Sequence, residues 1–382
     1  MAATPHVMLA CESLALAGGV ERFVCGLANS FSRQGMRVSV ATAAPLPAAW
    51  PYPLDEAVIR LGGPAGGAGR LEGAGAHETH WQILATQWRI GRTIARLARE
   101  ARPDVLILNG LTTAASALLA DRSLAPRSIC CDHNHFEARS RPWRWLRARL
   151  YPQVAAVVSL TQADAARFRA LNPRTEVIPN ASALSAEVPA PPGDPRVLAV
   201  GRLVAQKGMD LLLAAWPQVR ASVPGARLRI VGDGPLRAGL QAQAAALGIA
   251  GSVEWLAHSD RMADEYRAAA VFVLPSRYEG MPLALLEAQA MGVPSVAFDC
   301  PTGPAEVLSA DTGLLVPPGD TAALARSVVA LLVDPARRQA MAEAALARHR
   351  ALFSAERQVA RWTALVRTVA SRTPGQRQEV AA

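Results

Sequence analysis

One lysine and one arginine stand close together in a segment whose residue types suit anion binding. All but one of the forty Lys and Arg residues are arginine, and the exception is Lys207. It follows Arg202 by five residues, and glycines lie at 201 and 208. A forked guanidinium, a compact ammonium and a helix that begins near Met209 would together bind a diphosphate. The plain alternative is a chance surface lysine.

Two glutamates follow another predicted strand. Glu279 lies in the loop after the apolar run Val271–Leu274, and Glu287 lies in the helix that Pro282 introduces and Gly292 ends. Apolar residues surround Glu287 in the sequence, and a buried charge is costly without hydrogen-bonding partners. We therefore predict a ligand or a buried partner for Glu287.

Short β-branched runs that alternate with longer amphipathic stretches position these residues. This pattern is typical of βαβ units and parallel sheets, and it occurs twice. The predicted strands are Val7–Ala10, Arg37–Ala41, Asp104–Leu108, Ser128–Cys131 and Val154–Val158, then Val197–Val200, Arg227–Val231, Ser252–Trp255, Val271–Leu274 and Pro294–Ala297. The predicted fold class is α/β, with two Rossmann-like doubly wound domains facing a central cleft, where ligands bind beyond the carboxyl ends of the strands.

A Pro-rich segment divides the two halves. Residues 187–195 carry no periodicity, so we place the linker there, between an N-terminal domain at 1–186 and a C-terminal domain at 196–353. Residues 354–382 are expected to form a helix and tail that packs back on the N-terminal domain. Residues 62–69 are glycine-rich and predict a flexible loop.

Composition excludes several classes of protein. The chain has 382 residues and is 51% hydrophobic, which suits two globular domains. No run approaches the roughly 18 apolar residues of a spanning helix, and the first residues lack the basic start of a signal peptide. We expect a cytoplasmic protein. The five cysteines show no paired spacing, so disulfide, redox and metal roles are not expected.

The formal net charge of +9 is densest over Arg139–Tyr151, where arginines alternate with aromatic residues. Such a segment suits an anionic membrane surface, and a solvated helix is the alternative. Nucleic acid would attract the same charges, but no nucleic-acid motif accompanies them. The prediction is peripheral association with the cytoplasmic face of the inner membrane.

The charged segments resemble a known family. Gly-Arg-x4-Lys ending at Lys207, followed by Glu279, seven residues and Glu287, resembles the retaining glycosyltransferases of family 4. The similarity extends to 17–22, a glycine loop, to 132–134, a histidine segment, and to 231–235, a turn. The resemblance implies the GT-B fold and sugar transfer from a nucleotide diphosphate sugar with retention at the anomeric carbon.

The resemblance also implies roles for particular residues. Arg202 and Lys207 would stabilise the leaving diphosphate, Glu287 would hold the ribose, and His133 would contact the donor sugar. The remaining donor-site residues would be Gly18, Gly19, Ala257, His258, Ser259, Glu279, Gly280, Met281, Pro282 and Leu283. By this resemblance the catalytic group comprises Glu279, Arg202, Lys207 and His133.

Cofactors are not expected. Residues 232–237 begin like a dinucleotide fingerprint, but Arg237 stands where its third glycine belongs. The pairs His77/His80 and His133/His135 have ligand-like spacing, yet no carboxylate or cysteine cluster joins them. The chain also lacks an Asp-x-Asp motif, so we expect Arg and Lys rather than a metal to hold the diphosphate.

The acceptor and donor are predicted from weaker signs. Residues 300–306 resemble a variant found in bacterial polysaccharide and lipid-linked glycan enzymes, and they would place Thr302 and Glu306 near the donor. The prediction is a hexosyl or N-acetylhexosaminyl transferase that uses a UDP-sugar and a glycan or lipid-linked acceptor. The alternatives are a GDP-mannose-dependent mannosyltransferase, a noncatalytic nucleotide-sugar binder and an epimerase of the donor.

Overall fold

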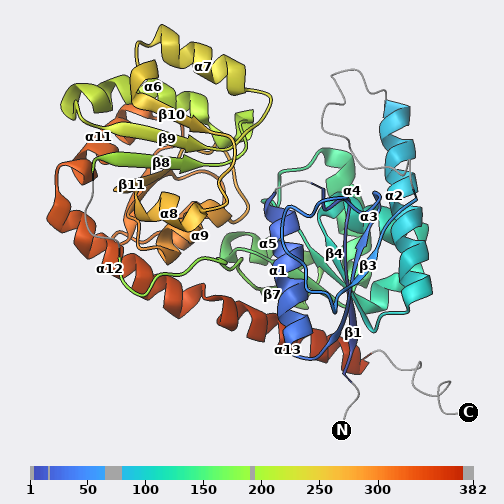
Figure 1. Ribbon diagram of the computed structural model, residues 1–382. Helices are drawn as coiled ribbons and strands as arrows, with labels where there is room; N and C mark the ends of the chain where they lie inside the picture. The colour runs from blue at the N-terminus through green and yellow to red at the C-terminus, as the bar shows by residue number, and fades with distance from the viewer. Residues whose placement is uncertain (1–3, 16–17, 65–79, 190–193, 373–382) are drawn as a thin grey trace, which may run out of the picture. The chain divides into compact units, whose positions relative to one another are not determined.

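The computed structural model describes residues 4–15, 18–64, 80–189 and 194–372. The chain forms two compact units (Figure 1). Unit 1 comprises Met1–Ile178 and Gln358–Ala382, and unit 2 comprises Pro179–Arg357. Each unit contains one sheet whose strands all run parallel. The predicted fold class, two Rossmann-like α/β domains, is therefore confirmed.

Unit 1 has seven strands in the order β3-β2-β1-β4-β5-β6-β7. The strands are β1 (His6–Cys11), β2 (Arg37–Thr42), β3 (Ile59–Leu61), β4 (Val105–Asn109), β5 (Ser128–Cys131), β6 (Ala156–Ser159) and β7 (Thr175–Val177). The helices are α1 (Gly19–Arg33), α2 (His80–Ala101), α3 (Leu111–Ala120), α4 (Arg141–Leu150), α5 (Gln162–Leu171) and α13 (Ala355–Arg372), with short 3-10 turns at η1 (Arg122–Arg127) and η2 (Tyr151–Gln153).

Both faces of this sheet are buried, as is usual for parallel sheets. Met8 of β1 and Leu106 of β4 pack in one cluster with Ile90 and Ile94 of α2. Val7, one residue before Met8, points to the opposite face and is also fully buried. The strands are therefore continuous apolar runs, and polar residues are confined mostly to the ends of the strands.

Unit 2 has six strands in the order β10-β9-β8-β11-β12-β13. The strands are β8 (Arg196–Val200), β9 (Arg227–Val231), β10 (Val253–Leu256), β11 (Val271–Leu274), β12 (Ser295–Phe298) and β13 (Gly313–Val316). The helices are α6 (Met209–Ser222), α7 (Arg237–Ala246), α8 (Met262–Arg267), α9 (Leu283–Ala290), α10 (Pro304–Val307), α11 (Thr321–Leu332) and α12 (Pro335–Leu352), with 3-10 turns at η3 (Ala205–Lys207) and η4 (Ala250–Ser252).

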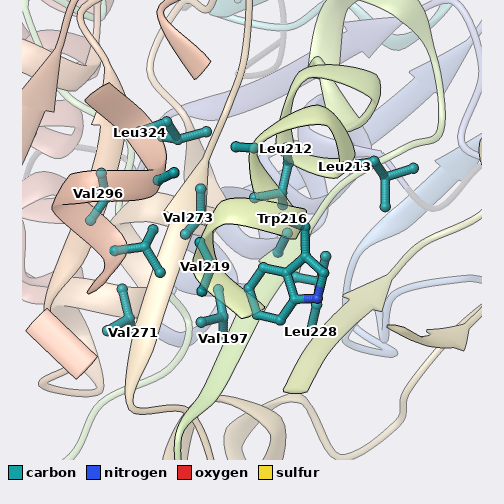
Figure 2. Close-up of a cluster of buried hydrophobic side chains, with 14 of the residues drawn as sticks. Val197, Leu212, Leu213, Trp216, Val219, Leu228, Val271, Val273, Val296 and Leu324 are labelled. Carbon is teal, nitrogen blue, oxygen red and sulfur yellow. The ribbon is translucent and has the colours of Figure 1, made fainter. Parts of the chain in front are cut away.

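The core of unit 2 is built around Trp216 of α6 (Figure 2). Its indole packs among side chains of three neighbouring strands, Val197, Leu228 and Val271. The indole N–H donates to Ser252 Oγ at 3.0 Å, which satisfies the one polar group of this large side chain. Helix α6, which follows the predicted diphosphate loop directly, is thereby fixed on the sheet.

The domain boundary differs from the prediction. The units divide after Ile178, whereas the sequence placed the linker at 187–195. Ala186 N–H donates to Ala290 O at 3.0 Å, and Arg350 donates to the carbonyls of Ala186 and Glu187 at 2.9 and 2.5 Å, so the start of the predicted linker is bound into unit 2. Proline content marked an irregular segment, but the chain passes from unit 1 to unit 2 before that segment begins. Residues 190–193 of the predicted linker and 65–69 of the predicted loop lie outside the described residues.

The C-terminal helix α13 supplies part of unit 1. Thr363 Oγ1 donates to Gln34 Oε1 at 2.9 Å, just beyond α1. Trp362, only 1% exposed, places its ring 5.7 Å from the ring of Phe23 in α1. The first unit is therefore assembled from two separate stretches of sequence.

Only part of the basic segment Arg139–Tyr151 is exposed. This corrects the prediction that the segment as a whole forms a surface for an anionic membrane. Arg147 is 1% exposed, and its guanidinium donates to Asp132 Oδ2 at 3.1 Å. Tyr151 is fully buried and also donates to Asp132. A helix that packs on a core must turn one stripe inward, and here that stripe includes an arginine paired with a carboxylate.

The outward stripe of the same segment keeps the basic and aromatic character. Arg139, Arg141, Trp145 and Arg149 are exposed, and the Arg149 guanidinium lies 5.3 Å from the centre of the Trp145 ring. Over the described ranges, no helix has the length and apolar character needed to cross a membrane.

Candidate functional site

The strand order reverses between β8 and β11 in unit 2, and two charged loops leave the sheet there. Such a reversal is where ligands bind in doubly wound sheets. The first loop runs from β8 through η3 to Gly208, which has a φ of 64°. A Cβ at Gly208 would lie 1.9 Å from Pro275 O, so only glycine allows this loop to approach the loop after β11.

Lys207 and Glu279 join the two loops. Lys207 Nζ lies 2.7 Å from Glu279 Oε1, and Ser276 Oγ donates to the same oxygen at 2.7 Å. The Glu279 side chain is 6% exposed and the Lys207 side chain 20%. A largely buried carboxylate with two donors is held in one orientation, while part of the ammonium remains open to solvent.

A second ion pair fixes the outer part of the same loops. Arg277 donates to both carboxylate oxygens of Asp210, at 2.8 and 2.6 Å. The hydrogen bond from Arg277 is the main reason why the pKa of Asp210 lies below its usual value. Gln206 Nε2 also donates to Tyr278 O at 3.0 Å. The two loops are therefore held together independently of any bound molecule.

Arg202 differs from Lys207 in its surroundings. Its side chain is exposed, at the point where the chain leaves β8. The structure thus brings Lys207 and Glu279 into contact and leaves Arg202 at the surface of the same loop.

Glu287 lies one turn inside α9 and is 2% exposed. Tyr266 of α8, itself fully buried, donates its hydroxyl to Glu287 Oε2 at 2.9 Å. The prediction that Glu287 has a buried partner is confirmed. Tyr266 was missed because nothing in the spacing of α8 relates it to α9.

The backbone between the two glutamates is buried. Gly280, Met281 and Pro282 form this stretch, and Pro282 precedes the first residue of α9, Leu283. Helix α9 has no side-chain hydrogen bond at its N-cap. Its first N–H groups lie at the carboxyl edge of the sheet, where the positive end of the helix dipole favours an anion.

The loop after β10 lies farther along this edge. Ala257 and His258 are exposed and Ser259 is half-buried. His258 Nε2 lies 2.9 Å from Asp260 Oδ1, and both side chains are exposed. β10 is separated from β8 by β9. The three residues therefore share the sheet edge with Lys207 without joining its ion pair.

Unit 1 has its own reversal of strand order, between β1 and β4, and polar residues meet there. Asn109 ends β4 and donates its Nδ2 to Ala10 O of β1 at 3.1 Å. Its Oδ1 lies 2.9 Å from Nε2 of His133, which follows β5. Asn109 therefore connects the ends of three neighbouring strands, and the sequence prediction did not include it.

Burial and these contacts define the protonation state and the tautomer of His133. Burial lowers the pKa of His133 to about 4, so the ring is neutral at pH 7. Because the Asn109 amide uses Nδ2 toward Ala10, its oxygen faces the ring and Nε2 of His133 carries the proton. Nδ1 is then left as an acceptor for a hydroxyl.

Helix α1 packs against this histidine. The Phe23 ring lies 4.8 Å from the His133 ring in an edge-to-face arrangement. Gly18 is the N-cap of α1 and Gly19 its first residue. A Cβ at Gly18 would lie 2.3 Å from the Glu21 carboxylate, so the absence of a side chain here leaves room for Glu21. Ala17 lies outside the described residues.

Few of the described side chains could bind a metal ion or act as a thiol nucleophile. Within the described ranges, no group of three His, Cys, Asp or Glu side chains is placed to hold a metal ion; His77 lies outside these ranges. All five cysteines are free and buried. Burial, and then the charge of Glu279, raises the pKa of Cys300 to about 12, so this thiol is not a nucleophile.

Two doubly wound domains, with a cation and carboxylate pair at one strand reversal and a neutral histidine at the other, define a GT-B type of protein. Residues 17–184 match the family model described as Glycosyltransferase Family 4. Residues 194–334 match the model described as Glycosyl transferases group 1. The two matches together span most of the chain, which belongs to this glycosyltransferase family.

Relatives of known name agree with the family. The chain is 36% identical over 230 residues to the amylovoran biosynthesis glycosyltransferase AmsD of Erwinia amylovora, covering 56% of this chain and 64% of AmsD. It is 38% identical over 167 residues to a GDP-mannose-dependent phosphatidylinositol monomannoside mannosyltransferase of Mycolicibacterium smegmatis, covering 41% of this chain and 43% of the relative. It thus spans less than two thirds of each of these relatives.

Solved structures show the same fold. Sucrose-phosphate synthase from Thermosynechococcus elongatus superposes with a TM-score of 0.81 at 22% identity, covering 97% of this chain and 100% of that structure. Anabaena HepE, solved with UDP and glucose, has a TM-score of 0.74 at 17% identity and covers 95% of this chain and 100% of that structure. The predicted GT-B fold is thus confirmed.

Proposed function

We propose that the chain transfers a hexose or N-acetylhexosamine from a nucleotide diphosphate sugar to a glycan or lipid-linked acceptor, with retention at the anomeric carbon. The observation that carries the proposal is the Lys207–Glu279 pair at the strand reversal of unit 2. It combines a partly open ammonium with a fixed carboxylate, and Arg202 supplies a second cation on the same loop.

In this proposal the diphosphate binds at the β8 and β11 loops. Arg202 and Lys207 stabilise the negative charge that develops on the leaving diphosphate. Glu287 holds the ribose, and its Tyr266 contact orients the carboxylate. Glu279 already accepts from Lys207 and Ser276, so its role is to aim the ammonium rather than to form a covalent intermediate.

Retention without a protein nucleophile requires attack from the face that the diphosphate leaves. A retaining enzyme with a covalent intermediate usually has two carboxylates about 5 Å apart around the reacting bond. Here Glu287 is bound to Tyr266 and Glu279 to Lys207. We therefore propose a front-face reaction, in which His133 of unit 1, with Nδ1 as acceptor, contacts a hydroxyl of the donor sugar.

The donor is proposed to be UDP-hexose or UDP-N-acetylhexosamine. GDP-mannose is the second candidate, and the name of the mycolicibacterial relative favours it. Calorimetry and saturation-transfer NMR with UDP-, GDP- and ADP-sugars would decide between the bases. Binding of one base only, lost in Lys207→Ala, is the expected result. Lys207→Arg tests the need for a compact ammonium, because a fork cannot occupy the same site.

The acceptor is proposed to be part of cell-surface polysaccharide synthesis, in line with the name of AmsD. Such acceptors are often membrane-bound, and the outward stripe of α4 would hold the protein at the cytoplasmic face of the membrane. Binding to vesicles with anionic lipid should weaken in salt and in Arg141→Gln/Arg149→Gln. Arg147 is excluded from this test because it is buried.

Two further tests separate the proposal from its competitors. Transfer should proceed without added metal and stay within twofold after EDTA, and a loss above tenfold would show that a divalent ion holds the diphosphate. A noncatalytic binder would bind the donor without releasing nucleoside diphosphate. An epimerase would convert the donor sugar in the absence of any acceptor.

A further inference from the structure

The backbone that follows Glu279 and leads into α9 is held by side chains from outside it. We propose that Thr302 and Asn180 are positioning residues, which fix the peptide groups of the donor loop, residues 279–282, so that the N–H groups of Gly280 and Met281 face the donor phosphates and the carbonyls of Glu279 and Met281 do not. This inference rests on the proposed function, because it assumes that the loop meets a phosphate.

Thr302 is held in an unfavourable backbone conformation. Its φ is 57°, in the left-handed region that β-branched residues rarely adopt. Its hydroxyl donates to Glu279 O at 2.7 Å. The next residue, Gly303, also has a positive φ, and a Cβ there would lie 2.6 Å from Gly280 O. Strain of this kind persists where the surroundings impose it, and it gathers at functional sites.

The Thr302 contact sets the direction of one peptide group. In a trans peptide the C=O and the following N–H point in opposite directions. Because the Glu279 carbonyl points at the Thr302 hydroxyl, the Gly280 N–H points away from it. A glycine at this position also removes the side chain that would screen the N–H from a ligand.

Asn180 holds the loop at its other end. Its side chain is 5% exposed, and Nδ2 donates to Met281 O at 3.1 Å. The opposite amide orientation would place two acceptor oxygens against each other, so the donor nitrogen must face Met281. Asn180 Oδ1 is buried without a hydrogen-bond partner among the residues that the structure describes. The hydrogen bond to Met281 O is therefore the one that orients the Asn180 side chain.

Both anchors bind carbonyl oxygens of the donor loop. If either carbonyl turned outward, it would present a partial negative charge to the diphosphate. At Glu279 this carbonyl would also replace the Gly280 N–H, whereas Pro282, which follows Met281, has no N–H to lose. The two side chains thus keep acceptors away from the anion while making no contact with it themselves. Their removal should impair transfer, because the N–H groups act most strongly on the charge that develops on the leaving group.

The decisive variants are three changes at Thr302. Thr302→Val keeps the shape but removes the hydroxyl and should lower kcat at least tenfold, with the Kd for UDP or GDP changed less than threefold. Thr302→Ser restores the hydroxyl and should recover at least half of kcat. Thr302→Gly relieves the strained φ, so it should keep or raise the Tm while kcat falls as in the valine variant. The matched control is Thr368→Val on the exposed face of α13.

A merely structural threonine would behave in the opposite way, with a lower Tm and an unchanged kcat. Asn180→Asp tests the second anchor, because the carboxylate has the same shape but cannot donate to Met281 O. It should lower kcat at least fivefold. Valine and aspartate variants that both keep kcat within twofold of the wild type would overturn the inference. If the wild type binds no nucleotide and transfers no sugar, the proposed function itself fails.

Discussion

The two units hold their candidate residues by different means. In unit 2, ion pairs do this, with Lys207 bound to Glu279 of the loop after β11 and Arg277 of that loop bound to Asp210 of α6. In unit 1, a neutral amide and an aromatic ring hold His133, and the charged residues Asp132 and Arg147 are buried behind it. The difference is one of charge: in unit 2 the candidate residues themselves form an ion pair, whereas in unit 1 the candidate His133 has neutral contacts and the ion pair is formed by other residues.

This contrast explains which residues the sequence revealed. Charged motifs on loops are conspicuous in a chain that is 51% hydrophobic, so Lys207 and Glu279 could be identified. Asn109 and Phe23 have ordinary types in ordinary elements, and only the meeting of β1, β4 and β5 gives them a role.

The largest effect is expected from breaking the buried pair of unit 1. Arg147→Ala leaves the Asp132 carboxylate buried without its guanidinium, which should cost about 3–5 kcal/mol in the free energy of unfolding. Hydrogen exchange should rise in α4 and β5, while the core strands of unit 2 serve as the internal control. Tyr151→Phe, which removes only one hydrogen bond, should cost about 1 kcal/mol. Equal protection in the wild type and Arg147→Ala would show that the pair adds nothing.

The next effect is expected in unit 2. Glu279→Ala should lower kcat by roughly 100-fold, because the ammonium of Lys207 loses its anchor at the leaving group. Steady-state transfer kinetics and a thermal melt would be measured together, since the expected loss is in rate and not in folding. Glu279→Gln keeps the shape and the Ser276 contact, so an intermediate rate would separate charge from packing. Near-normal turnover in the alanine variant would remove Glu279 from the mechanism.

Both units should share one response to pH. The pKa values of His133 and His349 are lowered to about 4 by burial, so both rings are neutral in the folded protein. The unfolded chain, with a histidine pKa near 6.5, binds more protons between pH 6.5 and 4. The free energy of unfolding should therefore fall as the pH drops through this window and should not depend on these groups above it.

His349 is better suited than His133 to a measurement of this pH dependence, because it is only 4% exposed. Urea titrations at pH 6.5 and 5 should show that His349→Leu removes about 1.5 kcal/mol of the difference between the two values. A wild-type stability that is flat across this window would mean that the rings are protonated in the folded state.

The smallest effect is expected at the exposed pair. The side chains of Arg277 and Asp210 are 40% and 38% exposed, and such pairs contribute at most about 1 kcal/mol. Arg277→Gln should therefore change the Tm only slightly and lose even that difference in 1 M salt. A cost like that of Arg147→Ala would contradict the difference expected between an exposed and a buried ion pair.

The fold was predictable in most of its parts. All ten predicted strands are present within about two residues of their expected ends, because buried parallel strands are continuous apolar runs. Three strands were missed, β3, β7 and β13, and each is an edge strand of three or four residues. The sequences of β3 and β7 are only three residues long and include charged side chains, so they carry little apolar signal, whereas β13 is apolar and was missed because it is short.

The basic segment shows where sequence patterns stop being informative. Arg147 and Arg149 are two residues apart in α4, yet one is buried against Asp132 and the other is exposed. Charge alone cannot distinguish them, since burial depends on the phase of the helix and on a partner fifteen residues away. The site in unit 2 was more predictable because its partners are loops that follow strands.

The return of the chain to unit 1 has a consequence for biosynthesis. Residues from Gln358 onward complete the first unit, and Trp362 packs there against Phe23. A ribosome makes these residues only after all of unit 2 has been synthesised. The surface around Phe23 in the first half of the nascent chain must therefore stay uncovered until these later residues have been made. Unit 2 is one continuous stretch and has no such delay, so it can finish folding before the unit that precedes it.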